Sequence, residues 1–198
     1  MSDAWARSQR REVGYNDSQW GIRHSRDYWM SFLKLDRLDY PVLEVGCGDS
    51  GLWRFDPQVH GLDPIDYSRL GGNFTLGVAE SLPFKDGEYE TALCVNALDH
   101  CADPAQAVRE MRRVCKRLVL WTYIFPHEAY RALYHPHPHA FTLSQVSKFL
   151  EGMKVTHWSY VSPYSCFAKT STTMGKLKLA AADALGVRAA LIHAEETD

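Results

Sequence analysis

The chain has 198 residues, of which 45% are apolar and 23% are charged, and its formal net charge is −2 at pH 7. These values are ordinary for one globular domain with a single sizeable core. They argue against a nucleic-acid partner, which usually needs a basic surface. The sequence shows no run of roughly 18 apolar residues and no signal peptide. We therefore expect a cytoplasmic protein with no membrane span.

The first forty residues are polar and aromatic. Within them, residues 25–38 place Tyr28, Trp29 and Phe32 mostly on one side of a predicted amphipathic helix. Short apolar runs follow, which are typical of parallel strands covered on both faces. These predicted strands lie at about 41–46, 59–63, 74–79, 91–96 and 118–124.

Two later helices have clear start signals. Asp103 and Pro104 have the residue types of an N-cap and a first helical position. Thr142 and Gln145 have the spacing of a capping box.

The C-terminal part is expected to add the last two strands of the sheet and then to form a helix. Residues 154–161 and 165–170 are predicted strands, and a helical stretch is predicted at about 174–192. We therefore expect three segments, namely an N-terminal helical lid or cap (1–40), a core (41–172) and a C-terminal helical extension (173–198).

The cysteines predict no disulfide framework and no zinc site, because their number is odd and their spacing unpaired. We expect reduced, mostly buried thiols. They are Cys47, Cys94, Cys101, Cys115 and Cys166.

The most informative stretch runs from Val42 to Gly51, where an apolar strand turns on Gly46 and Gly48. Glycines there permit a tight bend and let a ligand approach main-chain N–H groups. Taken alone, such a loop is a weak signal. The next strand strengthens it by ending in Asp63, where a ribose would present its hydroxyls.

A third strand leads into Ala79-Glu80-Ser81-Leu82-Pro83-Phe84-Lys85-Asp86, and a fourth leads into Leu98-Asp99-His100-Cys101-Ala102-Asp103-Pro104. In this order the pieces resemble the class I S-adenosylmethionine (SAM)-dependent methyltransferases. The pattern LEVGCG … AExLPFxD … LxHxxDP is similar to that of a small-molecule, methyltransferase type 11-like subgroup. The resemblance implies a Rossmann-like three-layer α/β sandwich, with a mostly parallel seven-stranded sheet whose last strand is antiparallel. It also implies SAM as cofactor and S-adenosyl-L-homocysteine as product.

The resemblance assigns cofactor contacts to several strand ends. Glu44 would orient the amino group of SAM, Asp63 would bind the ribose diol, and Glu80 would lie near the adenine amino group. The glycine loop would surround the methionine part. The other predicted contacts are Gly46, Cys47, Gly48, Pro64, Ala79 and Asn96.

One departure concerns the first crossovers. Gly48 and Asp63 are 15 positions apart, whereas the usual interval is about 20. We therefore predict that the first two crossover helices are reduced to about a turn each.

Histidines are the candidate bases. A loop of His127, His135, His137 and His139 interleaved with prolines follows the fifth strand. A histidine there could take a proton from a hydroxyl or amine acceptor, or could only decorate a surface loop. His139 is the first candidate because it adjoins the Thr142 helix cap.

His100 is the second candidate, although the resemblance favours a packing role for it. Some quinone-biosynthesis methyltransferases hold a divalent cation at this place. Asn96 stands where their leading acid would lie, so no metal is expected.

The resemblance implies methyl transfer to a small molecule. This in-line displacement mainly requires alignment and exclusion of water, so a base need not be visible. The alternatives are a SAM-binding regulatory or scaffold protein without methyl transfer, and methylation of RNA or protein. Trp20, Arg23, Tyr28 and Trp29 could form a lid, or their helix could only pack on the sheet.

Overall fold

The computed structural model describes residues 25–127, 138–161, 184 and 186–197. Its centre is one seven-stranded sheet with the order β3-β2-β1-β4-β5-β7-β6. The first five strands are parallel, and β7 is antiparallel to both β5 and β6. The strands are β1 (Val42–Val45), β2 (Val59–Asp63), β3 (Asn73–Leu76), β4 (Tyr89–Val95), β5 (Cys115–Ile124), β6 (Met153–Val161) and β7 (Arg188–Glu196). The predicted Rossmann-like fold is confirmed.

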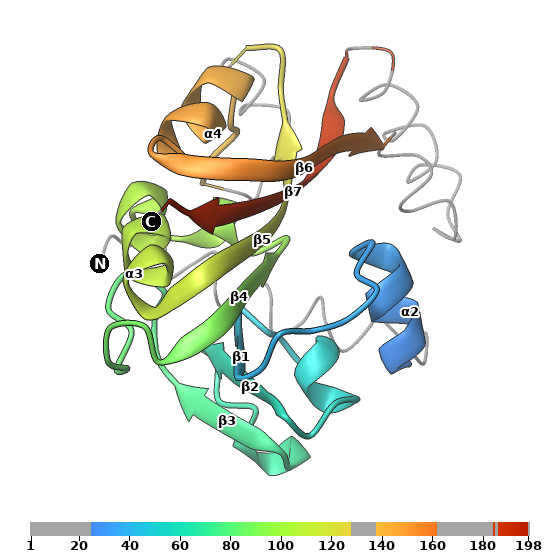
Figure 1. The fold of residues 1–198 in the computed structure, drawn as a ribbon, viewed down its shortest axis with the longest axis vertical. Coiled ribbons are helices and arrows are strands. Elements are labelled where there is room, and N and C mark those ends of the chain that lie inside the picture. Colours follow the sequence, from blue (N-terminus) through green and yellow to red (C-terminus); the bar gives the residue numbers. More distant parts are fainter. Residues whose placement is uncertain (1–24, 128–137, 162–183, 185, 198) are drawn as a thin grey trace.

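Helices cover both faces of this sheet (Figure 1). On one face, α3 (Pro104–Val114) and α4 (Leu143–Phe149) close a core that contains Met111 and Val146. On the other face, α2 (Arg26–Phe32) packs with Trp29 in a second core. The sheet is therefore buried on both sides, which explains why its central strands are continuous apolar runs. Among the described residues, no helix is long and apolar enough to cross a membrane.

The start signals of both later helices are confirmed. The Asp103 side chain accepts a hydrogen bond from the Gln106 N–H at 3.0 Å, and Pro104 is the first helical residue. The capping box of Thr142 and Gln145 is formed at the start of α4. At the N-terminus α2 is shorter than predicted, because Lys34 adopts a left-handed φ of 51° that a continuing helix excludes.

Both early crossovers are reduced, as predicted. Between β1 and β2 the chain forms only the 3-10 helix η1 (Leu52–Arg54), and between β2 and β3 only η2 (Ser68–Leu70). A third 3-10 turn, η3 (Leu98–His100), follows β4.

The helix predicted at 174–192 is wrong at its C-terminal part, because residues from Arg188 form β7. Alanine and leucine favour helices in isolation, but this segment pairs with strands on both sides and is mostly buried. Tertiary pairing therefore overrides local preference, and the predicted C-terminal extension contributes a strand to the central sheet. The strand predicted at 165–170 lies outside the described residues.

Candidate functional site

The candidate site lies where the parallel strands β1, β2 and β4 end side by side. The glycine loop after β1 is tied to β2, since the Gly46 and Cys47 N–H groups donate to the Leu62 carbonyl at 2.8 and 3.2 Å. Gly46 has a φ of +69°, and a Cβ there would overlap the Cβ of Ala97, which follows β4. The loop therefore packs directly against the end of β4, and only glycine fits at position 46.

Asp63 joins the end of β2 to this loop. Its Oδ2 accepts from the Gly48 N–H and its Oδ1 from the Ile65 N–H, both at 2.9 Å. The side chain is buried. A carboxylate oxygen has more than one acceptor position, so these bonds leave capacity for the hydroxyls of a ribose. The structure thus brings the predicted loop and the predicted acid together.

Glu44 is turned toward η1. Its two carboxylate oxygens accept from the N–H groups of Leu52 and Trp53 at 3.1 and 2.8 Å. Burial raises the pKa of the carboxyl to about 7, although these two hydrogen bonds lower it. A Cβ at Gly51 would lie 2.6 and 2.7 Å from the carboxylate oxygens. Glu44 therefore caps the shortened crossover, and its contact with the amino group of SAM stays a prediction.

Two other oxygen atoms at this edge are candidates for that amino group. Asp49 Oδ1 and Asn96 Oδ1 are buried and have no hydrogen-bond partner among the described residues. Asn96 has a left-handed φ of 52°, and its N–H donates to the Trp121 carbonyl at 2.9 Å. Buried acceptors without a partner are rare in proteins, whereas an ammonium group needs acceptors. These two atoms are therefore candidates to accept hydrogen bonds from an ammonium group. Asn96 is one of the predicted cofactor contacts, whereas Asp49 is not, and the only sequence signal of Asp49 is an acid next to Gly48.

Glu80 holds the start of α3. Its Oε1 accepts from the Ala102 and Asp103 N–H groups at 2.5 and 3.2 Å. The neighbouring Ala79 is buried in the core under α3 and α4. The predicted contact of Glu80 with the adenine of SAM stays a prediction.

Cys47 and Pro64 complete the predicted cofactor contacts. Cys47 is buried, and burial raises the pKa of its thiol. It can therefore offer backbone but not a thiolate. Pro64 is half-buried directly after Asp63.

The two candidate bases lie next to η3. His139 Nε2 is 3.0 Å from the Cys101 carbonyl, and its ring stacks on Phe141 with centroids 5.9 Å apart. This contact makes Nε2 the protonated nitrogen. His100 Nε2 lies 4.0 Å from Asp99 Oδ1.

The remaining histidines of the loop are His127, His135 and His137. His127 is exposed. His135 and His137 lie outside the described residues. Among the described residues there is no group of three or more metal-ligating side chains.

The aromatic face of α2 packs on the sheet. Trp29 is buried and meets Phe32 edge-on, and Phe32 contacts Trp121 of β5 with centroids 5.7 Å apart. Tyr28 is exposed. The alternative that this helix packs on the sheet is therefore observed. A lid that includes Trp20 and Arg23 lies outside the described residues.

Residues 43–118 match a family model described as a methyltransferase domain. This stretch contains the glycine loop, Asp63, Glu80 and the whole of α3. Over these residues the chain is similar to methyltransferase domains. A comparison with curated protein sequences gives no match.

Solved structures show the same fold. A geranyl diphosphate C-methyltransferase from Streptomyces coelicolor, solved with S-adenosyl-L-homocysteine, has a TM-score of 0.71 and 14% identity, and covers 87% of this chain and 77% of its own. A possible histamine N-methyltransferase from Thermotoga maritima has a TM-score of 0.67 and 15% identity, covering 96% of this chain and 99% of its own. The [4+2]-cyclase SpnF has a TM-score of 0.66 and 15% identity, covering 98% and 97%. With the domain match, this fold supports the predicted SAM-dependent methyltransferase and its cofactor.

Proposed function

We propose that this protein transfers the methyl group of SAM to a small-molecule acceptor. The observation that carries the proposal is the meeting of the glycine loop, Asp63 and two partnerless buried oxygens at one edge of the sheet. When bound, SAM supplies an electrophilic methyl group on a sulfonium. Asp63 would accept from its ribose hydroxyls, and Asp49 and Asn96 from its ammonium.

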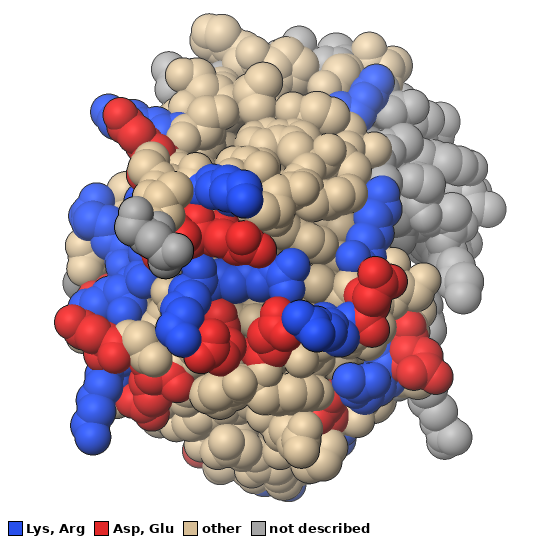
Figure 2. Space-filling model, viewed as in Figure 1, with Lys and Arg blue, Asp and Glu red and all other residues tan. Residues whose placement is uncertain are grey.

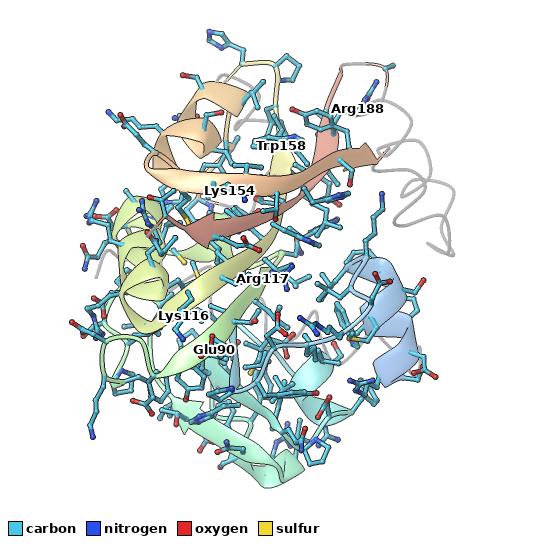
Figure 3. All side chains as sticks on the ribbon, viewed as in Figure 1. Glu90, Lys116, Arg117, Lys154, Trp158 and Arg188 are labelled. Atoms are coloured by element: carbon cyan, nitrogen blue, oxygen red, sulfur yellow. The ribbon has the colours of Figure 1, made fainter. Side chains whose placement is uncertain are left out.

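The choice of a small acceptor is supported by surface charge. On the face seen in Figure 2, basic and acidic side chains are interspersed. Glu90 of β4 binds Lys116 of β5 at 2.6 Å, and Arg117 binds Asp39 at 3.1 Å (Figure 3). Such paired charges do not form the basic stripe that nucleic acid needs. Two of the similar structures also bear names of small-molecule methyltransferases.

We also propose His139 as the base where the acceptor must lose a proton, with His100 as second candidate. Because Nε2 of His139 donates to the Cys101 carbonyl, Nδ1 is the basic nitrogen of the neutral ring. His139→Gln retains a side-chain donor for the Cys101 carbonyl but has no basic nitrogen. A base role predicts that this variant loses about 10²–10⁴-fold in turnover at unchanged SAM affinity. Turnover within a few-fold of the parent would remove His139 from the mechanism.

The second candidate function is SAM binding without methyl transfer. The likeness to a protein named a [4+2]-cyclase favours it, because the same fold there carries another activity.

The test has two parts. Calorimetry should show SAM binding that Asp63→Ala weakens by about 1.5–3 kcal/mol, because the change removes charged hydrogen bonds. SAM labelled with tritium on its methyl group is then incubated with the protein and a cell extract, and label is counted separately in the small-molecule and macromolecular fractions.

Label in the small-molecule fraction that disappears with Asp63→Ala would support the proposal. Label in macromolecules would contradict a small acceptor. Tight binding of SAM with no labelled product in either fraction would favour the binding protein.

A further inference from the structure

The shortened first crossover has no long helix to pack against the glycine loop. The side chain of Trp53 packs there in its place. Between β1 and β2 the chain has only η1, whose three residues include Trp53. The Trp53 side chain is 1% exposed, which is unusual for so large a residue in a three-residue helix. Its contacts therefore show what replaces the missing helix.

Trp53 is bonded to β1 and to the glycine loop that follows it. Its backbone N–H donates to Oε2 of Glu44 in β1 at 2.8 Å. Its indole N–H donates to the Gly48 carbonyl at 3.0 Å. The N–H of Gly48 itself donates to Asp63. Both polar groups of Gly48 are therefore fixed, one by the proposed ribose-binding acid and the other by the indole.

The strands leave space for this ring. A Cβ at Gly61 of β2 would lie 2.8 Å from Trp53 Cγ, so a larger residue there would displace the indole. A Cβ at Gly72 would lie 3.2 Å from Trp53 Cζ3. The ring also contacts Phe74 of β3 with centroids 5.4 Å apart. The indole is thus held between the loop and two strands in one orientation.

We propose that Trp53 is a positioning residue for SAM, which fixes the Gly48 peptide through its indole N–H and so aligns the glycine loop with Asp63. The inference rests on the proposed cofactor site. Trp53 does not need to touch SAM. Its effect is on affinity, because a loop already held in its binding conformation loses less conformational freedom when the cofactor binds.

The test compares two tryptophans. Trp53→Phe keeps an aromatic ring but removes the N–H donor. Trp158→Phe is the matched control, because Trp158 lies on the edge strand β6 (Figure 3) and its buried indole nitrogen has no partner among the described residues. Calorimetry with SAM is run well below the melting temperature of each variant. We expect a dissociation constant raised about 2- to 12-fold by Trp53→Phe, the effect of one lost hydrogen bond, and unchanged by Trp158→Phe.

The outcomes separate three cases. Weaker binding by folded Trp53→Phe alone supports the inference. A lower melting temperature with unchanged affinity overturns it and leaves Trp53 as a packing residue. If the parent protein does not bind SAM, the proposed function fails instead.

A second measurement covers a variant that does not fold. In parent protein with ¹⁵N-labelled tryptophan, addition of S-adenosyl-L-homocysteine should shift the Trp53 indole N–H resonance and slow its exchange with solvent. The Trp158 resonance should not change. An unchanged Trp53 resonance at saturation would also overturn the inference.

Discussion

At the scale of single residues, Gly46 is the position where the structure tolerates least change. Its φ of +69° disfavours any side chain, and a Cβ would also overlap Ala97. Gly71 separates these two effects, because its φ is +75° but a Cβ there would meet nothing within 4 Å. We expect Gly71→Ala to cost about 1 kcal/mol of unfolding free energy from strain alone. Gly46→Ala should cost about 1–3 kcal/mol more through overlap and should abolish SAM binding. Urea denaturation and calorimetry measure the two effects, and equal losses in both variants would contradict the packing at position 46.

Glu44 predicts a dependence of stability on pH. Burial raises the pKa of its carboxyl from 4.5 to about 7 in the folded protein. Between these values the unfolded chain releases a proton that the folded protein retains, so the contribution of Glu44 to stability falls as pH rises. Glu44→Gln cannot titrate. The difference in unfolding free energy, parent minus variant, should therefore fall by about 2–3 kcal/mol between pH 5 and pH 8. A difference that stays constant or grows would show that Glu44 is charged in the folded state.

At the scale of elements, the segment after β3 is held by side chains of α3 in place of a helix of its own. Arg113 donates to the carbonyls of Leu82 and Phe84 at 3.0 and 2.8 Å. Glu110 accepts from the Leu82 N–H at 2.9 Å and also binds Arg113. Together with the bonds of Glu80, these contacts fix the stretch that the resemblance assigns to adenine.

Arg113→Lys should loosen this segment, because lysine lacks the planar fork that binds several carbonyls at once. The side chain is 31% exposed, so we expect a modest loss of about 1 kcal/mol. Hydrogen exchange at the Leu82 N–H should accelerate in the variant. Arg109→Lys is the control, since Arg109 is exposed and its described bond is to Gln106 on the same helix. Equal exchange rates in both variants would show that Arg113 does not hold the segment.

The elements that the sequence predicts well are those with local signals. Asp103 and Thr142 mark helix starts because their side chains bond to N–H groups three residues away. β7 could not be predicted in this way, since its strand conformation depends on pairing with β5 and β6. The short interval between Gly48 and Asp63 did predict the reduced crossover, because too few residues were present for a full helix.

At the scale of the whole molecule, the position of the candidate site follows from the sheet order, since parallel strands bring their carboxyl ends to one edge. The position of Asp63 at the end of β2, next to the glycine loop, could therefore be predicted from the sequence. The proposed roles of Asp49 and Trp53 could not be predicted, because they depend on which atoms the folded chain buries and which partners it provides. The orientation of the Glu44 carboxylate could not be predicted either, because it depends on η1 placing the Leu52 and Trp53 N–H groups beside it in the folded chain.

SAM bound at this edge would be held by residues from three strands and two loops. Its binding should therefore stabilise the entire fold. A ligand that binds only the folded state, at 100 times its dissociation constant, adds about 2.7 kcal/mol to the unfolding free energy. For a chain of this size we expect SAM to raise the melting temperature by about 5–10 °C. Asp63→Ala is expected to bind SAM at least about tenfold more weakly, so at the same concentration its gain in unfolding free energy should fall to about 1.4 kcal/mol or less. Trp158→Phe should retain the shift of the parent. Differential scanning calorimetry measures all three, and a parent that melts at the same temperature with and without SAM would exclude SAM binding by the folded protein.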